Sequence, residues 1–266
     1  MAATAVWAQK KTVNVETPGT LGQQLGSGRM SIASLKVTGT LNGTDVKVLR
    51  AMAGGSETGS GSGGALSELD LSEAVLVKGG DCYLRVRDGY DAYTENDVVS
   101  SKMFYGCGTL RRVVIPNTVR RIYNDSFSAC PHLETIETAD NRTFTSIDGV
   151  LYRADSTLVY RCPQGLHPQV VSLREGVKQI YPSAYRGIGS ITELQLPSTI
   201  QGINDMAFFG CPNIRTIRFA APNPPAMENA FDASVVANAR LIVPRGSAER
   251  YRSKNGWKEF KNITEE

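Results

Sequence analysis

The sequence has little histidine, no long apolar run and almost no charge imbalance. Its 266 residues include two histidines, so a metal site built from imidazoles or a serine-histidine-aspartate mechanism has little material. No stretch approaches the ~18 uninterrupted apolar residues that a membrane-spanning helix needs. The 29 Lys and Arg against 26 Asp and Glu give a formal net charge of +3, too small to indicate nucleic-acid binding without a local basic face. The composition predicts a folded chain without a transmembrane segment or a nucleic-acid partner.

Motifs that indicate catalysis or cofactor binding are also missing. The five cysteines form no C-x-x-C pair, and H-E-x-x-H and G-x-S-x-G are absent. His132 and His167 lie next to prolines, which favours solvent-facing turns over ligand positions. Asp148 precedes a glycine, which is typical of a tight turn and is a weaker basis for a catalytic carboxylate. We therefore predict no catalytic residue, no metal and no cofactor.

The first eight residues resemble the end of a secretory signal. Val6 and Ala8 occupy the −3 and −1 positions of a cleavage site that would leave Gln9 as the first residue. The alternative is an ordinary frayed N-terminus, and no cysteine stands at the cleavage point to indicate a lipoprotein anchor. Residues 1–8 are assigned to a signal remnant, and export is expected.

The sequence is rich in internal repetition, with a period of about 23 residues. One aromatic position of the repeat is occupied by Phe104, Phe127, Tyr185, Phe208 and Phe231. The first four are each followed by the pattern L-x-x-L-x-L, whose apolar residues are expected to point inward along a short strand; Thr138 takes the third position after Phe127. Cys107, Cys130 and Cys211 share a further position, which predicts buried small hydrophobes rather than reactive thiols.

These repeats predict an α/β leucine-rich-repeat solenoid over residues 66–231, with one short parallel strand per coil. The spacing from Phe127 to Tyr185 exceeds two periods by about half a period, so one repeat contains an insertion at about 144–166. Within it, segments 146–152 and 158–161 predict two strands of a β-hairpin. A single coil cannot bury its inward face, so both ends of the stack need caps.

Residues 9–65 are predicted to form the N-terminal cap, with a strand at 35–38, a helix at 45–52 and a Gly/Ser-rich loop at 54–64. This loop has the composition of a flexible linker. It lacks the Lys-Ser or Lys-Thr pair that ends a phosphate-binding loop.

Residues 232–266 are predicted to form the C-terminal cap. Its expected parts are a strand at 239–243, a helix at 247–255 with Ser247 as N-cap and Gly256 at C′, and a lid of Trp257 and Phe260.

Several segments together resemble the BspA-like leucine-rich repeat proteins of anaerobic commensal and pathogenic bacteria. They are the repeat start at 104–110, the Ser-Ile-Asp-Gly-Val-Leu-Tyr segment at 146–152, Asn223-Pro-Pro225, and the Val-Pro-x-Gly-Ser ending at 243–247 followed by Gly256-Trp257. The resemblance covers most of residues 30–266. It implies export to the cell surface or periplasm, no catalysis, and, for some members, adhesion to host matrix or plasma glycoproteins such as fibronectin and fibrinogen.

The solvent-facing strand positions are the first candidate binding surface, because a solenoid places equivalent positions side by side. They are Ser67, Glu68, Asp70, Arg111, Arg112, Val114, Glu134, Thr135, Glu137, Thr192, Glu193, Gln195, Arg215, Thr216 and Arg218. Arg111 and Glu134 are expected to be cross-strand neighbours, and such a pair contributes only a few tenths of a kcal/mol. The alternative is a mutually neutralised, solvated surface.

Two further segments have candidate roles. Tyr83, Tyr90 and Tyr93 alternate with arginines, a composition typical of interfaces, unless the rings pack on the N-terminal cap. Asp155-Ser156-Thr157 resembles an O-glycosylation signal of some of these bacteria, with Ser156 as acceptor, and a plain turn is the alternative.

The function predicted from the sequence is that of an exported, non-enzymatic binding protein. Its partner is expected to be a host or envelope protein or glycoprotein, and its location the cell surface, the periplasm or the medium. A structural or scaffolding protein of the bacterial envelope is the alternative. A glycan hydrolase would need two carboxylates ~5 to 10 Å apart in a cleft, which a filled solenoid does not readily provide.

Overall fold

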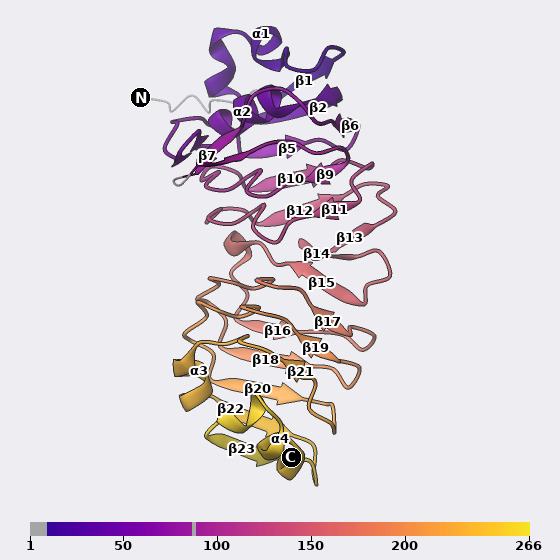
Figure 1. Cartoon of the computed structure of the whole chain (residues 1–266), viewed down its shortest axis with the longest axis vertical. Helices are drawn as coiled ribbons and strands as arrows, with labels where there is room; N and C mark the ends of the chain where they lie inside the picture. Colours follow the sequence, from indigo (N-terminus) through magenta and orange to yellow (C-terminus); the bar gives the residue numbers. More distant parts are fainter. Residues whose placement is uncertain (1–9, 87–88) are drawn as a thin grey trace, which may run out of the picture. The chain divides into compact units, whose positions relative to one another are not determined.

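The computed structural model describes residues 10–86 and 89–266, which form two compact units divided after Phe144 (Figure 1). Unit 1 ends at Phe144 and unit 2 runs from Thr145 to Glu266. The signal remnant predicted at 1–8 lies outside the described residues. Short parallel strands are the main element of both units.

The main sheet of unit 1 contains five parallel strands in one row. In spatial order they are β1 (Lys10–Val15), β2 (Ser34–Leu41), β5 (Glu68–Asp70), β10 (Arg112–Ile115) and β12 (Thr135–Thr138), with β6 (Ala74–Leu76) also paired to β2. The register aligns Leu35, Leu69, Val113 and Ile136 on four neighbouring strands, and none of them is more than 1% exposed. The inward positions of the repeat therefore form the core of this unit.

The helices of unit 1 lie before the first repeat. They are α1 (Leu21–Leu25), η1 (Ser27–Ser31) and α2 (Gly43–Met52). The helix predicted at 45–52 begins earlier, at Gly43. Asn42 caps it, because its side chain accepts a hydrogen bond from Thr44 N–H at 3.0 Å. Asp45 completes the cap by accepting from Asn42 N–H at 3.0 Å.

The strand predicted at 35–38 is the middle of the longer β2, which continues because β1 pairs along it. The sequence analysis did not identify β1.

The Gly/Ser-rich segment is part of unit 1, and its prediction as a flexible linker is wrong. Its strands β3 (Gly55–Ser56) and β4 (Gly59–Ser60) pair antiparallel, and Gly54 C=O accepts from Gly61 N–H at 2.8 Å. A Cβ on Gly64 would lie 2.1 Å from Met52 O. Glycine is needed here because two backbone segments approach closely.

Unit 1 is completed by two small strand pairs and by stacked rings. The pairs are β7 (Leu84–Val86) with β8 (Tyr90–Ala92), antiparallel, and β9 (Val98–Val99) with β11 (Arg121–Ile122), parallel. Phe104 stacks on Phe127 with ring centroids 5.3 Å apart, and the Cys130 thiol donates to Phe104 C=O at 3.0 Å.

Unit 2 contains two sheets (Figure 1). The first is parallel throughout and has the order β16 (Val170–Ser172), β18 (Glu193–Leu196), β20 (Thr216–Phe219), β22 (Arg240–Val243) and β23 (Asn262–Glu265). Each strand lies about one period further along the chain than its neighbour. The successive register partners that show this are Val171, Leu194, Ile217, Leu241 and Ile263.

The second sheet has the order β13 (Phe144–Ile147), β14 (Val150–Arg153), β15 (Leu158–Arg161), β17 (Gln179–Ile180), β19 (Gly202–Ile203) and β21 (Ala226–Met227). The strands β14 and β15 pair antiparallel, whereas β15, β17, β19 and β21 are parallel neighbours. A short η2 (Gln164–Leu166) precedes β16.

The segment expected as one strand at 146–152 is divided between β13 and β14. Asp148 and Gly149 between them have φ values of 51° and 80°. Two left-handed residues in a row are typical of a tight two-residue turn, and Asp-Gly is a preferred sequence for it. The chain therefore reverses in the middle of the predicted strand.

A column of rings forms part of the core of unit 2. Tyr185 stacks on Phe208 at 5.1 Å, and Phe208 stacks on Phe231 at 5.2 Å, with interplanar angles of 11° and 5°. All three rings belong to the aromatic position of the repeat, so parallel stacking of repeats stacks the rings as well.

The end of unit 2 contains α3 (Ala233–Asn238), α4 (Ala248–Ser253) and η3 (Trp257–Glu259). The helix predicted to reach Asn255 ends at Ser253, because Lys254 is already extended. Gly256, with a φ of +84°, is not at C′ but turns the chain into η3. This brings Trp257 to a fully buried position, where its Nε1–H donates to Pro225 C=O at 2.7 Å.

Candidate functional site

The outward positions of unit 1 neutralise one another. Arg111 forms an ion pair with Glu134, its neighbour on the next repeat, as the sequence predicts. Arg112 donates through Nε and Nη2 to the two carboxylate oxygens of Glu137 at 2.7 and 2.5 Å, and this bidentate contact raises the pKa of Arg112. Thr135 lies half-buried in the same strand as Glu137. Arg111 and Arg112 therefore have their counter-ions within the face.

The prediction that Val114 is accessible to solvent is wrong, because only 5% of its surface is exposed. It lies in register between Asp70 on one side and Glu137 on the other. The longer side chains of these neighbours cover a short valine, and the ion pair of Arg112 with Glu137 runs beside it.

The tyrosine-rich segment provides less surface than its composition suggests. Tyr83 is 1% exposed and its hydroxyl donates to Ser101 C=O at 2.6 Å, so its prediction as a surface contact residue is wrong. Tyr90 begins β8. Tyr93 is 53% exposed.

Ser156 lies in the turn between β14 and β15, with a φ of 58°. The neighbouring Asp155 accepts from Arg153 Nε and Nη2 at 2.9 Å each and from Thr157 N–H at 3.0 Å. The Arg153 contact holds the pKa of the Asp155 carboxyl well below its usual range. The turn is thus closed by polar contacts on either side of Ser156, which is half-buried.

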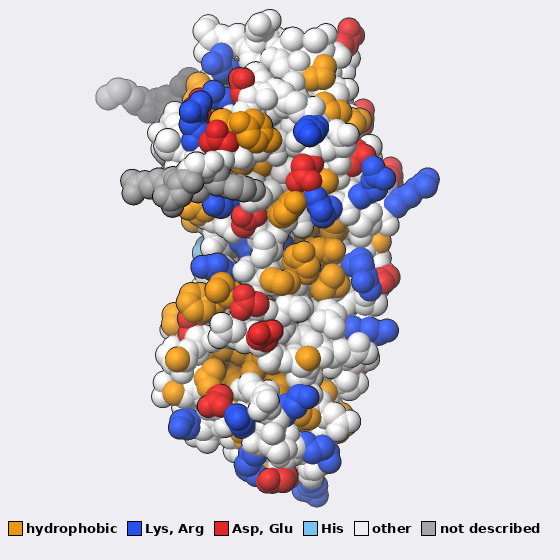
Figure 2. All heavy atoms as spheres, in the orientation of Figure 1, with side chains coloured by type: hydrophobic (Ala, Val, Ile, Leu, Met, Phe, Trp, Pro, Cys, Tyr) orange, Lys and Arg blue, Asp and Glu red, His pale blue; other side chains and the backbone are white. Residues whose placement is uncertain are grey.

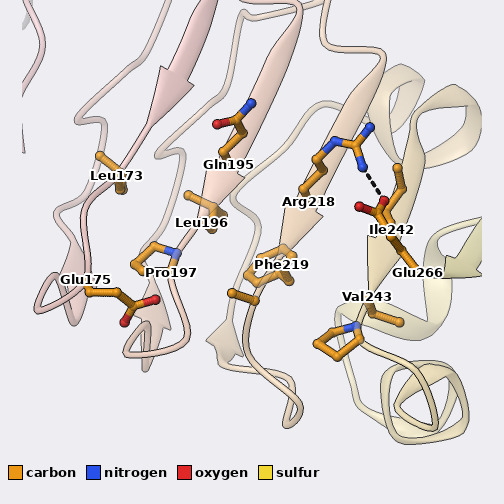
Figure 3. A pocket seen from close by; sticks show the side chains of 12 residues that line it. Leu173, Glu175, Gln195, Leu196, Pro197, Arg218, Phe219, Ile242, Val243 and Glu266 are labelled. Atoms are coloured by element: carbon orange, nitrogen blue, oxygen red, sulfur yellow. Dashed lines mark hydrogen bonds and ion pairs between the residues drawn. The ribbon is translucent and has the colours of Figure 1, made fainter.

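A groove of about 460 Å³ lies in unit 2 along the ends of neighbouring strands (Figure 3). Of the predicted surface residues, Gln195 and Arg218 line it. The remaining lining residues are Leu173, Glu175, Leu196, Pro197, Phe219, Ala220, Ile242, Val243, Pro244 and Glu266. Thr192, Glu193, Arg215 and Thr216 lie outside the lining.

The floor of the groove is apolar and firmly packed. Leu196 and Phe219 are register partners on β18 and β20, and they are 3% and 5% exposed. Phe219 meets the buried Trp257 edge to face, with centroids 4.9 Å apart. A partner would therefore contact a surface that is already ordered.

The rim of the groove is charged. Arg218 forms an ion pair with Glu266, drawn as a dashed line in Figure 3, and another with Glu193 at 3.3 Å. Gln195 Nε2 donates to the same Glu193 oxygen at 2.9 Å. Glu175 accepts from Ser198 N–H at 2.8 Å, and this bond lowers the pKa of the Glu175 carboxyl. Glu175 is ionised near neutral pH. The guanidinium of Arg218 lies between two carboxylates, those of Glu193 and Glu266.

The apolar part of this groove was not predicted from the sequence. The repeat pattern predicts that residues such as Leu196 and Phe219 belong to the core, which agrees with their burial. The signal that was available is the proline that follows the third apolar position in several repeats, as at Pro197 and Pro244. Proline stops the strand ladder and leaves the strand ends open.

The buried cysteines are structural, as the sequence predicts. Cys107, Cys130, Cys162 and Cys211 are at most 1% exposed, and burial raises the pKa of Cys162 and Cys211 to about 12. A thiol with so high a pKa stays protonated at pH 8, whereas an ordinary thiol (pKa ≈ 8.5) is partly ionised there.

We expect iodoacetamide at pH 8 to label only the half-exposed Cys82 in the folded protein, and all five cysteines after denaturation. Intact-mass analysis before and after adding guanidinium checks this result. Labelling of two or more thiols in the folded protein would contradict the burial described above.

Other chemistry is limited in the described part of the chain. Residues 10–86 and 89–266 contain no cluster of three metal-ligating side chains, and both His132 and His167 are exposed. Within these ranges no helix has the length and apolarity to cross a bilayer.

Parallel strands with aligned, buried L-x-x-L-x-L positions and an open groove at their ends define a leucine-rich repeat protein. The chain belongs to the BspA-type leucine-rich repeat family: the model of the "BspA type Leucine rich repeat region" matches residues 97–237 in six copies, more than half of the chain. The family resemblance seen in the sequence is thereby confirmed.

Solved structures that are similar to this chain include the following three. A leucine-rich repeat protein from Eubacterium ventriosum has 13% identity and a TM-score of 0.45, over 89% of this chain and 73% of that one. A leucine-rich cell surface protein from Faecalibacterium prausnitzii has 17% identity and a TM-score of 0.45, over 96% and 78%. The pneumococcal vaccine antigen PcpA has 10% identity and a TM-score of 0.40, over 88% and 68%. No curated protein sequence matches this chain.

Proposed function

We propose that this chain is an exported, non-enzymatic adhesin that recognises host matrix or plasma glycoproteins through the outward side of its strands in unit 2. The observation that carries the proposal is the groove at the strand ends, which has an ordered apolar floor and a charged rim. Membership of the BspA-type family supports a binding role at the cell surface.

The groove suits a segment of a partner protein. Its volume of about 460 Å³ leaves room for side chains of such a segment. The apolar floor would take an apolar side chain, while Arg218 and Gln195 would orient polar groups of the partner. Arginine is enriched among the residues that dominate binding energy, which makes Arg218 the principal anchor.

The proposed architecture around the groove is a capped leucine-rich-repeat solenoid with a single repeat period and one hairpin insertion. Register partners one period apart in both units, such as Val113 with Ile136 and Leu194 with Ile217, support the period. The antiparallel pair β14 and β15 supports the insertion, and the buried Trp257 supports a C-terminal lid.

The envelope-scaffold alternative has support in both units, because Arg111 and Arg112 in unit 1 and Arg218 in unit 2 are all ion-paired within their own face. A face with internal counter-ions gains less from a charged partner, because the existing pairs must first be broken.

We expect the double variant Gln195→Ala/Arg218→Ala to lower affinity for the partner about 5- to 30-fold, corresponding to ~1–2 kcal/mol, without lowering the melting temperature by more than a few degrees. The measurement is capture of the purified chain on immobilised matrix proteins, plasma glycoproteins and a glycan array, followed by titration of each hit.

Arg153→Ala/Gln201→Ala is the matched control, because it removes the same residue types from exposed positions of unit 2 outside the groove. Equal binding by wild type and the groove variant would reject the groove as the site. If nothing in the panel is captured, the scaffold alternative is supported, and crosslinking in the native host follows.

A further inference from the structure

The net charge of the chain is concentrated at its C-terminal end. Residues 240–266 contain seven Lys and Arg against four Glu, while the preceding part of the chain contains equal numbers of the two signs. The whole formal excess of +3 therefore comes from this segment. Figure 2 shows Lys and Arg side chains gathered at the lower end of the view, where Figure 1 places α4, β22 and β23.

Three cations of unit 2 lie at the starting ends of three neighbouring strands. Arg215 directly precedes β20, Arg240 begins β22, and Lys261 directly precedes β23. The register pairs Thr216 with Arg240 and Arg240 with Asn262, so Arg215 and Lys261 are at the same level, with Arg240 one residue further on between them. At ~4.8 Å per strand, the three backbone positions span about 10 Å. We name Arg215, Arg240 and Lys261 the basic row.

The basic row is exposed and electrically uncompensated. None of its three members takes part in an ion pair within the described part of the chain. Arg215 Nη1 donates to Pro212 C=O at 2.8 Å, and Arg240 Nε donates to Thr264 Oγ1 at 3.2 Å. These neutral partners orient the guanidinium groups without cancelling their charge.

The surroundings of the basic row are polar, with little negative charge. Thr216 and Asn262 flank Arg240 on the adjacent strands. Glu193 is in register with Thr216 on β18, which pairs with the edge of β20 opposite to β22. Its carboxylate forms an ion pair with Arg218. Glu259 is the acidic residue nearest to Lys261 in sequence, and the exposed Lys258 precedes it directly.

We infer that the basic row binds a sulfated polysaccharide. Sulfate groups present a series of permanent negative charges that three neighbouring, unpaired cations match, and hydroxyl and amide groups such as those of Thr216 and Asn262 suit the sugar rings between them. The inference rests on the proposed function only in that export gives the chain access to such glycans. Single-stranded nucleic acid fits less well, because the rings it would stack on, Tyr251, Trp257 and Phe260, are at most 4% exposed.

The test uses the full chain, immobilised heparin as the probe, and surface plasmon resonance at low and physiological salt. We expect the triple variant Arg215→Gln/Arg240→Gln/Lys261→Gln to bind heparin at least tenfold more weakly and with a flatter salt dependence than wild type, because fewer counter-ions are released. The matched control is Lys78→Gln/Arg142→Gln/Lys178→Gln, which removes the same charge from exposed residues that form no ion pair in the described part of the chain.

Three outcomes would overturn the inference. They are no binding of wild type at physiological salt, equal weakening in the triple variant and its control, and binding of a single-stranded oligonucleotide as tight as that of heparin. Circular dichroism verifies that each variant is folded. None of the residues changed in the triple variant lines the groove, so this variant should keep its affinity for a partner that the groove binds. Loss of the groove function and loss of the glycan site are therefore separately measurable.

Discussion

Replacing Phe208 with alanine should lower the free energy of unfolding by about 3–5 kcal/mol. Phe208 is fully buried and is the central ring of three, stacked at 5.1 Å on Tyr185 and at 5.2 Å on Phe231. Its removal takes away apolar contacts with the repeats on both sides and leaves a cavity between them. Because repeats are stabilised mainly by their neighbours, the loss affects the coupling of three repeats at once.

Phe209→Ala is the matched control for this prediction. Phe209 follows Phe208 in the chain and is 41% exposed, and the guanidinium carbon of Arg186 lies 5.6 Å from the centroid of its ring. Removal of the Phe209 ring should therefore cost less than about 1 kcal/mol. Denaturant titration followed by circular dichroism measures both variants. Similar losses for Phe208→Ala and Phe209→Ala would show that the ring column is not a main source of stability.

Replacing Arg50 with methionine should cost about 3–5 kcal/mol, because several carbonyl groups lose their hydrogen-bond donor at once. Arg50 is fully buried in α2, where its Nη1 donates to the carbonyl oxygens of Lys102, Met103 and Tyr105 at 2.9–3.2 Å. Its Nη2 donates to Ser56 C=O at 2.9 Å. Methionine fills much of the space but leaves these carbonyl groups without their donor, and burial of an unsatisfied carbonyl costs ~1–3 kcal/mol.

Two further variants separate the donor geometry from the charge. Arg50→Lys retains a cation but has a single donor centre, so it should recover only part of the stability. Arg120→Met removes an exposed arginine that pairs with Asp97 at 2.8 Å, and it should cost less than about 1 kcal/mol. Differential scanning calorimetry compares the three. An Arg50→Met protein as stable as Arg120→Met would contradict the role assigned to the buried guanidinium.

The repeat architecture could be predicted because identical spacing is visible without any knowledge of contacts. Phe104 and Phe127, or Tyr185 and Phe208, are one period apart, and rings in the same phase of a stacked repeat meet. The non-repeated parts gave no such signal. Strand β1 exists because β2 offers it an edge, and the buried position of Arg50 follows from carbonyl groups that come together only in the folded unit.

The candidate site was predicted only in part, because outward direction and accessibility are different properties. Val114 has the outward phase of its strand but is covered by its neighbours in register. Arg218 and Gln195 were identified correctly as surface residues, whereas the floor beside them consists of residues whose pattern indicates core. A groove at strand ends depends on which residues become neighbours across repeats, and a single repeat does not contain that information.

The constant offset between β16, β18 and β20 has a consequence for the way this gene can change length. Duplication or loss of one whole period keeps every inward leucine and every ring in phase, whereas an insertion of another length shifts the residues that follow out of phase unless it leaves the stack. Each duplicated copy would lengthen the groove by one strand spacing, ~4.8 Å. Recombination between neighbouring repeats can therefore adjust the length of the recognised segment in fixed steps, without redesign of the core.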